Sequence, residues 1–206
     1  MFRLIAPCDV AIGDRLARLV PQQITYPEVG ALKTLSFPQG YCIDRNRIQL
    51  GHGRACYERA KSALRDWEMF NVTWVRLFPR VPCIEPGTDI AISARYLGIW
   101  KVNVCRIVYT VRDEGDVCRF GVALGTLSEH LLTGEELFYV EWNRTDDSVS
   151  YRVDSFSRAI GFASRLLYPI VRRLQRRFAR ESRAAMARAC AAPEARRPPR
   201  SEPARS

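Results

Sequence analysis

The chain has 206 residues, of which 47% are hydrophobic and 26% are charged, an ordinary balance for a globular domain that buries a sizeable core. Its net charge of +10 comes from one end, because the segment from Arg158 to Ser206 holds thirteen arginines and three glutamates. Residues 1–157 then hold 19 basic and 19 acidic residues and are neutral. The net charge of the whole chain therefore says nothing about the partners of residues 1–157.

Neither a secretion signal nor a membrane span is predicted. Residues 1–16 lack the apolar core of about 7–15 residues that a signal peptide has. Arg165 interrupts the best approach to the roughly 18 apolar residues that cross a bilayer. The seven cysteines are far apart and show no metal-ligand spacing, so we expect no metal and no cofactor. An odd number of cysteines without a disulfide framework indicates a reducing cytoplasm.

The first elements of the chain alternate between irregular and periodic stretches. Residues 1–23 are expected to precede the domain, with a short helix at Asp9–Leu19. Prolines and glycines in residues 24–41 are typical of extended chain that wraps over a domain surface. A strand is predicted at Tyr41–Gly51, and residues 53–70 are helical by period, with their apolar side chains on one stripe.

A series of strands follows. It begins with a short strand at 72–78 and continues at 88–96, 101–112, 117–125, 135–143 and 148–156. Turn residues connect these runs. Within each longer run apolar residues alternate with others, as Phe120 and Val122 do in one and Phe138 and Val140 in another. This pattern is typical of an antiparallel sheet with one buried face.

The longest helix is predicted from Arg158 to about Ala189, with Ser157 as its N-cap. Apolar residues recur there at helical spacing, and arginines occupy most of the remaining positions. Pro169 falls inside the pattern and should kink the helix or divide it after Tyr168. Residues 191–206 are rich in proline and arginine and are expected to form a disordered tail.

The order strand, helix, six strands, long helix predicts an α+β helix-grip domain over residues 24–190. In this architecture, found in START and Bet v 1-like proteins, a seven-stranded antiparallel sheet wraps around a long C-terminal helix. Such folds commonly enclose an apolar cavity. A split barrel with different strand pairing would give much the same pattern.

Several segments also resemble one known family. They are ITYPEVG (24–30), PQGY (38–41), GHG followed by ERAKSALRDW (51–67), RIVYTV (106–111), FGVALGTLSEH (120–130), GEELF (134–138) and the ending at 159–182. On these motifs, over about residues 20–185, the chain resembles the domain-of-unknown-function family 1990 (uncharacterised protein family 0548). The resemblance implies the START/Bet v 1-like superfamily and brings no established activity. The family often has a tyrosine where Val122 stands and Pro-Gly where Ser128-Glu129 stand, so no role for that tyrosine hydroxyl carries over.

His130 marks the first candidate site. It lies close in sequence to Glu129, Glu135 and Glu136, and a histidine near carboxylates can act as a general base near neutral pH. His130, Glu135 and Glu136 are therefore candidate catalytic residues. The same groups could make a weak metal site, but their spacing matches no metal signature. The alternative is a loop histidine that caps a strand end, before two glutamates that open the next strand.

Four further residues are candidates for ligand binding. Arg106 and Arg119 lie within predicted strands, and either would suit an acidic ligand if it faced the concave side of the sheet. A shift of one residue in strand register would turn either side chain to the other face of the sheet, so the sequence leaves their direction open. Phe120 and Tyr151 belong to a set of aromatic residues that fits either an apolar cavity or a packed core. The glycines around His52 can shape a turn or leave amide groups free for an anion.

Three functions remain open from the sequence. The first is binding of a small hydrophobic or amphipathic ligand, which requires a pocket of at least a few hundred Å³. The second is an enzyme that uses His130 with Glu135 or Glu136 at the mouth of this pocket. The third is a peripheral protein whose arginine-rich helix contacts an anionic membrane surface. That helix could equally be a solvated face, and without interleaved aromatic residues we predict no specific nucleic acid. The sequence leaves the oligomeric state open.

Overall fold

The computed structural model describes residues 2–3, 8–19, 23–34, 36–96, 98–128, 130, 132–161 and 166–191. Its strands are β1 (Phe2–Arg3), β2 (Cys42–His52), β3 (Val75–Phe78), β4 (Asp89–Tyr96), β5 (Ile99–Asp113), β6 (Val117–Thr126), β7 (Leu132–Asn143) and β8 (Ser148–Ala159). Its helices are α1 (Asp9–Leu19), α2 (Gly53–Arg65), the short 3₁₀ helix η1 (Glu68–Phe70) and α4 (Tyr168–Cys190).

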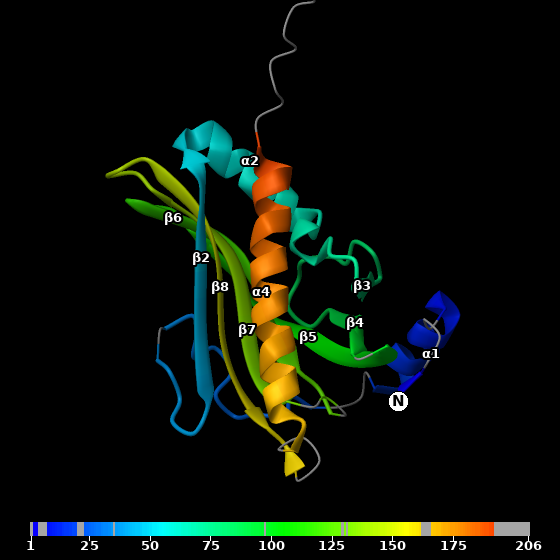
Figure 1. The fold of residues 1–206 in the computed structure, drawn as a ribbon. Coiled ribbons are helices and arrows are strands. Elements are labelled where there is room, and N and C mark those ends of the chain that lie inside the picture. Colours follow the sequence, from blue (N-terminus) through cyan, green and yellow to red (C-terminus); the bar gives the residue numbers. More distant parts are fainter. Residues whose placement is uncertain are drawn as a thin grey trace, which may run out of the picture.

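All strand pairs are antiparallel and form one sheet in the order β2-β8-β7-β6-β5-β4-β3, with β1 added beside β5. The curved sheet holds α4 against one of its faces, while α2 packs near the C-terminal end of α4 (Figure 1). Seven strands around a long C-terminal helix confirm the predicted α+β helix-grip and exclude the split barrel.

The face beneath α4 is the main core of the domain. Alternation along the strands turns Phe120 and Val122 of β6, and Phe138 of β7, toward the helix. Phe178 of α4 closes this layer, with its ring centroid 5.3 Å from that of Phe70 and 6.2 Å from that of Phe138. Burial of these apolar side chains fixes the helix to the sheet.

The opposite, outer face of the sheet is covered by residues 23–34 and 36–41, which confirms the predicted surface wrap. Tyr26 and Leu32 are buried there, and the ring of Tyr26 lies edge-on to Phe156 of β8 at 5.4 Å. Gly125 of β6 allows this approach, because a Cβ at that position would stand 2.6 Å from the hydroxyl oxygen of Tyr26.

The predicted start of the long helix is wrong. Ser157 is not an N-cap but a residue of β8, paired with Cys42 of β2 and Gly134 of β7. The helix α4 begins at Tyr168 with Pro169 in its first turn, where a proline loses no helical hydrogen bond. Proline therefore opens the helix at the point where the sequence predicted a kink or division. Part of the expected helix, residues 162–165, lies outside the described residues.

The predicted helix over 53–70 is two elements. The α2 helix ends at Arg65 because Trp67 takes a left-handed conformation with φ 58°, and η1 follows. The next strand, β3, begins at Val75 rather than at residue 72. The helix predicted at Asp9–Leu19 is confirmed as α1. The expected tail lies outside the described residues from 192 onward.

Candidate functional site

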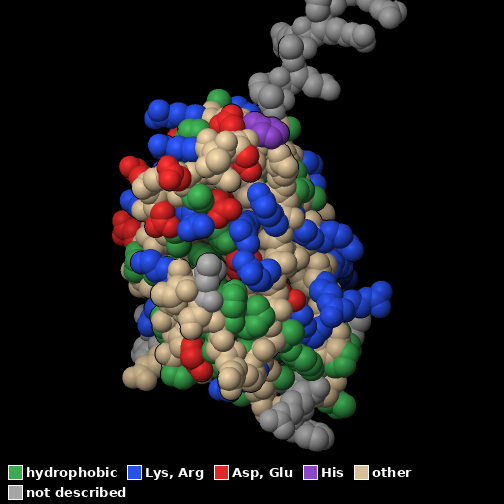
Figure 2. All heavy atoms as spheres, turned by 90° about the vertical axis from the view of Figure 1, so that its left-hand side faces the viewer, with side chains coloured by type: hydrophobic (Ala, Val, Ile, Leu, Met, Phe, Trp, Pro, Cys, Tyr) green, Lys and Arg blue, Asp and Glu red, His purple; other side chains and the backbone are tan. Residues whose placement is uncertain are grey.

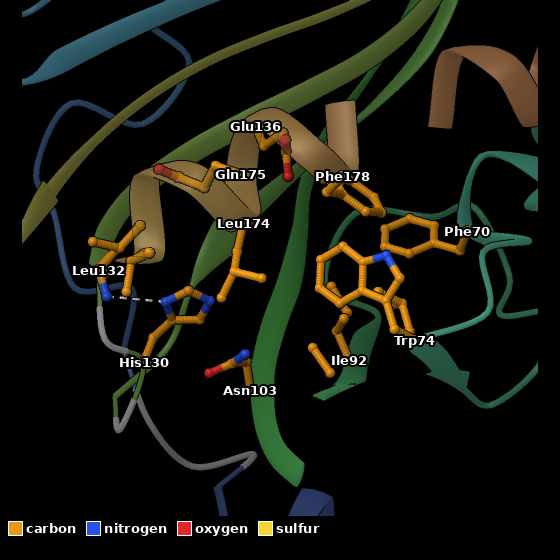
Figure 3. A pocket seen from close by; sticks show the side chains of 13 residues that line it. Phe70, Trp74, Ile92, Asn103, His130, Leu132, Glu136, Leu174, Gln175 and Phe178 are labelled. Carbon is orange, nitrogen blue, oxygen red and sulfur yellow. Dashed lines mark hydrogen bonds between the residues drawn. The ribbon is translucent and has the colours of Figure 1, made fainter. Parts of the chain in front are cut away.

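A pocket of about 120 Å³ lies between α4 and the sheet. Its walls come from η1, β3, β4, β5, β7 and α4, and Figure 3 shows their side chains converging on one space. The lining residues are Phe70, Trp74, Val75, Ile92, Ala94, Asn103, His130, Leu132, Glu136, Val171, Leu174, Gln175 and Phe178. The pocket is smaller than the few hundred Å³ expected from the sequence, and it is mostly apolar with a few polar groups.

His130 enters this pocket from the connection between β6 and β7 (Figure 3). Its Nδ1 accepts a hydrogen bond from the backbone N–H of Leu132 at 3.1 Å. An Nδ1 that accepts must be unprotonated, so in the neutral ring the proton resides on Nε2. Burial and the positive charge of Lys101 lower the pKa of His130 to about 3. The imidazole is therefore neutral at physiological pH, and this low pKa disfavours tuning as a base near neutral pH, while a catalytic role for His130 stays a prediction.

Glu136 is the group that titrates near neutral pH. It lies on β7 opposite Leu124 and Ser155, on the face that α4 covers. Burial, with a smaller effect from the negative charge of Asp44, raises the pKa of Glu136 to about 7. Within the described part of the chain no group donates a hydrogen bond to this carboxylate. Glu136 therefore turns an unengaged carboxyl group toward the pocket.

Gln175 completes the polar side of the pocket but is already engaged. Its side-chain oxygen accepts a hydrogen bond from Arg172 at 2.8 Å, and its Nε2 donates to Ser157 at 3.2 Å. Arg172 in turn pairs with Asp44 of β2 through both terminal nitrogens, one of them at 2.6 Å. This chain of contacts ties α4 to the edge of the sheet beside the pocket.

Glu135, the residue before Glu136, faces the opposite side of the sheet. It is buried, and its Oε2 accepts hydrogen bonds from the hydroxyl of Tyr26 and the backbone N–H of Gly30, both at 2.9 Å. Its Oε1 accepts from the hydroxyl of Tyr109 at 2.7 Å. Burial, then the charge of Glu135, raises the pKa of both tyrosines. The structure therefore brings His130 and Glu136 together but separates Glu135 from them.

The two arginines proposed to bind a ligand also lie on the outer face of the sheet. Arg106 pairs with Asp89 of β4 in a two-point contact at 2.7 and 2.9 Å. Arg119 donates to Glu141 of β7 at 2.8 Å. Neither lines the pocket beneath α4. Their carboxylate neighbours stabilise both positive charges in place.

Phe120 and Tyr151 face α4 but lie outside the pocket lining. Phe120 is buried, and the guanidinium of Arg65 lies 4.6 Å from its ring centroid. The hydroxyl of Tyr151 shares a 2.9 Å hydrogen bond with that of Ser182 on α4. Both residues belong to the main core cluster, Phe120 also lines a second pocket beside α2, and a ligand-binding role for either stays a prediction.

Asn103, Leu174 and Gln175 line the pocket and were not identified as site residues from the sequence. Asn103 carried a signal, because it stands among apolar neighbours in Val102–Cys105, a run otherwise typical of a buried strand. The other two belong to the helical pattern of α4, and nothing in their spacing distinguishes pocket positions from core positions.

The arginine-rich helix exposes much of its charge. In Figure 2, Lys and Arg side chains gather along the right-hand side of the molecule, which is the side where α4 lies. Arg173, Arg176, Arg177 and Arg180 are exposed. Arg177 also pairs with Glu181 at 2.7 Å and lies over the ring of Trp74, and Arg180 lies 3.9 Å from Glu181. Contact of this face with an anionic surface stays a prediction.

The fold and the pocket define the class: a helix-grip domain with an apolar pocket beneath its C-terminal helix. The family model described as "Domain of unknown function (DUF1990)" matches residues 25–185, and the chain belongs to this family. A UPF0548 protein of Deinococcus radiodurans is 35% identical over 192 residues, which covers 87% of this chain and 94% of that protein. A UPF0548 protein of Arabidopsis thaliana is 36% identical over 148 residues, covering 69% and 70% of the two chains.

Solved structures resemble this chain only distantly. Human STARD10 aligns with a TM-score of 0.46 and 11% identity, covering 90% of this chain and 80% of its own. Ara h 8.0201 aligns with a TM-score of 0.42 and 12% identity, covering 71% and 98%. At these values the similarity carries no argument about ligands. Among the helices in the described ranges, none combines the length and apolar character that a membrane crossing requires.

Proposed function

We propose that this protein binds a small amphipathic molecule in the pocket between α4 and the sheet. The observation that carries the proposal is the unengaged carboxyl group of Glu136. It lines the same pocket as His130, among mostly apolar side chains. This carboxyl group is half-buried and so only partly solvated, and no described residue donates a hydrogen bond to it. A ligand that donates to it or accepts from it gains hydrogen bonds for which no protein group competes.

The polar groups of the pocket restrict the chemistry of the ligand. The neutral imidazole of His130 has its proton on Nε2 and donates, because Nδ1 is engaged by Leu132. Glu136, with its pKa of about 7, can donate as an acid or accept as a carboxylate. A hydroxyl or carbonyl oxygen suits both groups. The remaining walls, which include Phe70, Trp74 and Leu174, suit a short apolar body.

The volume restricts the size of the ligand. Sites for drug-sized ligands occupy about 300–1,000 Å³, and this pocket holds about 120 Å³. The ligand is therefore small, a short alcohol, ketone or acid rather than a long-chain lipid.

Native mass spectrometry of the purified protein, followed by ligand-observed NMR with short alcohols, ketones and acids, tests the proposal. Leu174→Phe enlarges a side chain that lines the pocket, whereas Leu166→Phe makes the same change at an exposed leucine outside it. We expect a bound small molecule with the unchanged protein and with L166F, and its loss with L174F. Absence of any bound species from both measurements, or equal binding by the two variants, would overturn the proposal.

A second candidate function is acid–base catalysis in the same pocket. A general acid or base works best when its pKa lies near the working pH, and the pKa of Glu136 is about 7. In this hypothesis Glu136 transfers the proton, while the Nε2–H of His130 stabilises charge that develops on a ligand oxygen. The change Glu136→Gln should then abolish conversion of a bound molecule while leaving its binding measurable.

The seven cysteines are all free thiols. This supports the cytoplasm as the compartment, because thiols stay reduced there. Mass measurement of the protein alkylated in denaturant at cell lysis would test it, since seven modified thiols are expected, four of which are buried in the folded protein.

A further inference from the structure

A second pocket, of about 350 Å³, lies far from α4's N-terminal half, between α2, the β5–β6 hairpin and the end of β7. Its lining holds six cationic and three anionic side chains around the aromatic rings of Tyr57, Phe120 and Trp142. The excess positive charge is local, because residues 1–157 are neutral as a whole. The volume falls within the usual range for small-molecule sites of about 300–1,000 Å³.

Four of the cations in this pocket lack a carboxylate partner. Within the described ranges, no carboxylate lies within 4.0 Å of the guanidinium of Arg54, Arg65, Arg112 or Arg144. Two of the three acidic residues of the lining lie beside other cations, since Glu58 pairs with Lys61 at 3.1 Å and Asp113 lies 3.7 Å from Arg119. The third, Glu114, makes no ion pair within 4.0 Å among the described residues, and the six cations and three anions leave the lining with a net charge of +3. Four guanidinium groups around one hollow create a positive potential that an anion would relieve.

Aromatic rings hold two of these arginines in place. The guanidinium of Arg65 lies 4.6 Å from the ring centroid of Phe120, and that of Arg144 lies 5.2 Å from the ring centroid of Trp142. Stacking restricts the motion of both side chains, so a ligand loses less of their freedom when it binds. Arginines that serve only as a solvated surface would not need to be held against aromatic rings.

We propose that this pocket binds a small molecule that carries a phosphate group and a planar ring, the chemistry of a nucleotide. Guanidinium groups bind phosphate oxygens through paired hydrogen bonds. Trp142 is half-buried, with Arg144 over its ring and the ring centroid of Tyr57 at 5.8 Å, so the flat surfaces left for a base are the guanidinium planes of Arg144 and Arg65. The site is separate from the pocket beneath α4 and shares no lining residue with it.

Titration of the full-length protein with AMP, at low salt and with ribose 5-phosphate as the ring-free comparison, tests the proposal. Calorimetry gives the affinity, and the indole N–H signal of Trp142 reports the location by NMR. The indole N–H of Trp67, which donates to the backbone of Pro82 in the core, serves as an internal reference. We expect saturable AMP binding that shifts the signal of Trp142 and leaves that of Trp67 in place.

The double variant Arg65→Gln, Arg144→Gln removes two charges from the pocket, and Arg173→Gln, Arg176→Gln removes two from the exposed face of α4. We expect the first to weaken AMP binding at least about tenfold, as the loss of charge-assisted hydrogen bonds does. The second should change it by less than about twofold. All four arginines are exposed, so both variants should fold.

Three results would overturn the proposal. One is no saturable binding of AMP up to about 1 mM, a concentration that would detect even a weak site. Another is equal weakening by the two double variants, because that would show attraction to net charge alone. The third is binding of ribose 5-phosphate as tight as that of AMP, since the planar ring would then contribute nothing.

Discussion

Glu135 and Glu136 are adjacent on β7, and their carboxyl groups serve opposite faces of the sheet. Glu135 accepts three hydrogen bonds beneath the segment that covers the outer face. Glu136 faces the pocket beneath α4 and has no donor among the described residues. The first carboxylate holds a covering segment, and the second is engaged by no described residue. Their substitutions should therefore have different effects.

Glu135→Gln should destabilise the protein by about 1–3 kcal/mol, because an amide nitrogen cannot accept the hydrogen bonds that a carboxylate oxygen accepts. Either Tyr109 or the pair of Tyr26 and Gly30 then loses its acceptor. Urea unfolding measures the loss. Glu114→Gln, at an exposed position, is the control and should stay within about 0.5 kcal/mol of the unchanged protein. Equal stability of both variants would contradict a structural role for Glu135.

His130 and Glu136 should make opposite contributions to stability as pH changes. The folded-state pKa of Glu136, about 7, exceeds its ordinary value of 4.5. The folded state then holds a proton that the unfolded state has released, so this contribution falls as pH rises from 4.5 through 7. The folded-state pKa of His130, about 3, lies below its ordinary 6.5. Its contribution therefore rises with pH from 3 to 6.5.

The two slopes should largely cancel between pH 4.5 and 6.5 in the unchanged protein. Glu136→Gln removes the falling contribution, so stability should rise with pH across this window. His130→Asn removes the rising contribution, so stability should fall with pH through about 7. Urea unfolding at several pH values, compared between the variants, measures both slopes. Parallel pH profiles for the two variants would show that neither pKa is displaced as described.

Gly134→Ala should destabilise the protein by about 3 kcal/mol or more, because the added Cβ would clash with backbone atoms, which cannot move aside as a side chain can. A Cβ at this position would lie 1.9 Å from the carbonyl oxygen of Phe156, and its φ of +151° disfavours other residues. Gly115→Ala is the matched control, since a Cβ there meets open space. Thermal unfolding compares the two. A small effect at Gly134 would require β7 and β8 to separate locally without cost.

The sequence predicted the order of elements well because most of them are set by local period. Alternation placed Phe138 and Val140 on one face of β7, and the same parity assigns Glu136 to that face and Glu135 to the other. The distinction between the two glutamates was therefore accessible from the sequence. The same reasoning applies to Arg119, which is out of phase with Phe120.

What the sequence could not provide depends on contacts between distant segments. Residues after Ser157 match a helical period, but pairing of β8 with β2 and β7 extends the strand to Ala159. Tertiary pairing overrides local propensity at such a junction. Likewise, the pKa of His130 depends on burial and on Lys101, which is distant in sequence. Of the glutamates that follow His130 in the chain, Glu136 shares its pocket and Glu135 lies on the opposite face of the sheet, so closeness in sequence did not decide closeness in space.

Asp44→Asn should both loosen α4 and lower the pKa of Glu136. The side chains of Arg172 and Asp44 are 10% and 25% exposed, so loss of the carboxylate should cost about 1–3 kcal/mol, less than for a fully buried pair. The negative charge of Asp44 also contributes to the raised pKa of Glu136. Its removal, which leaves Arg172 positive, should bring that pKa toward 4.5, as carboxyl ¹³C NMR titration can measure.

Glu58→Gln is the matched control, because it removes a carboxylate from an exposed pair with Lys61 on α2. It should cost less than about 1 kcal/mol and leave the pKa of Glu136 unchanged. Hydrogen exchange should show faster opening of the first turns of α4 in D44N and not in E58Q. If D44N loosened the helix without moving the pKa of Glu136, the ion pair would anchor α4 without tuning the pocket. If D44N changed neither the opening of α4 nor the pKa of Glu136, the contact between Arg172 and Asp44 would neither anchor the helix nor influence the pocket.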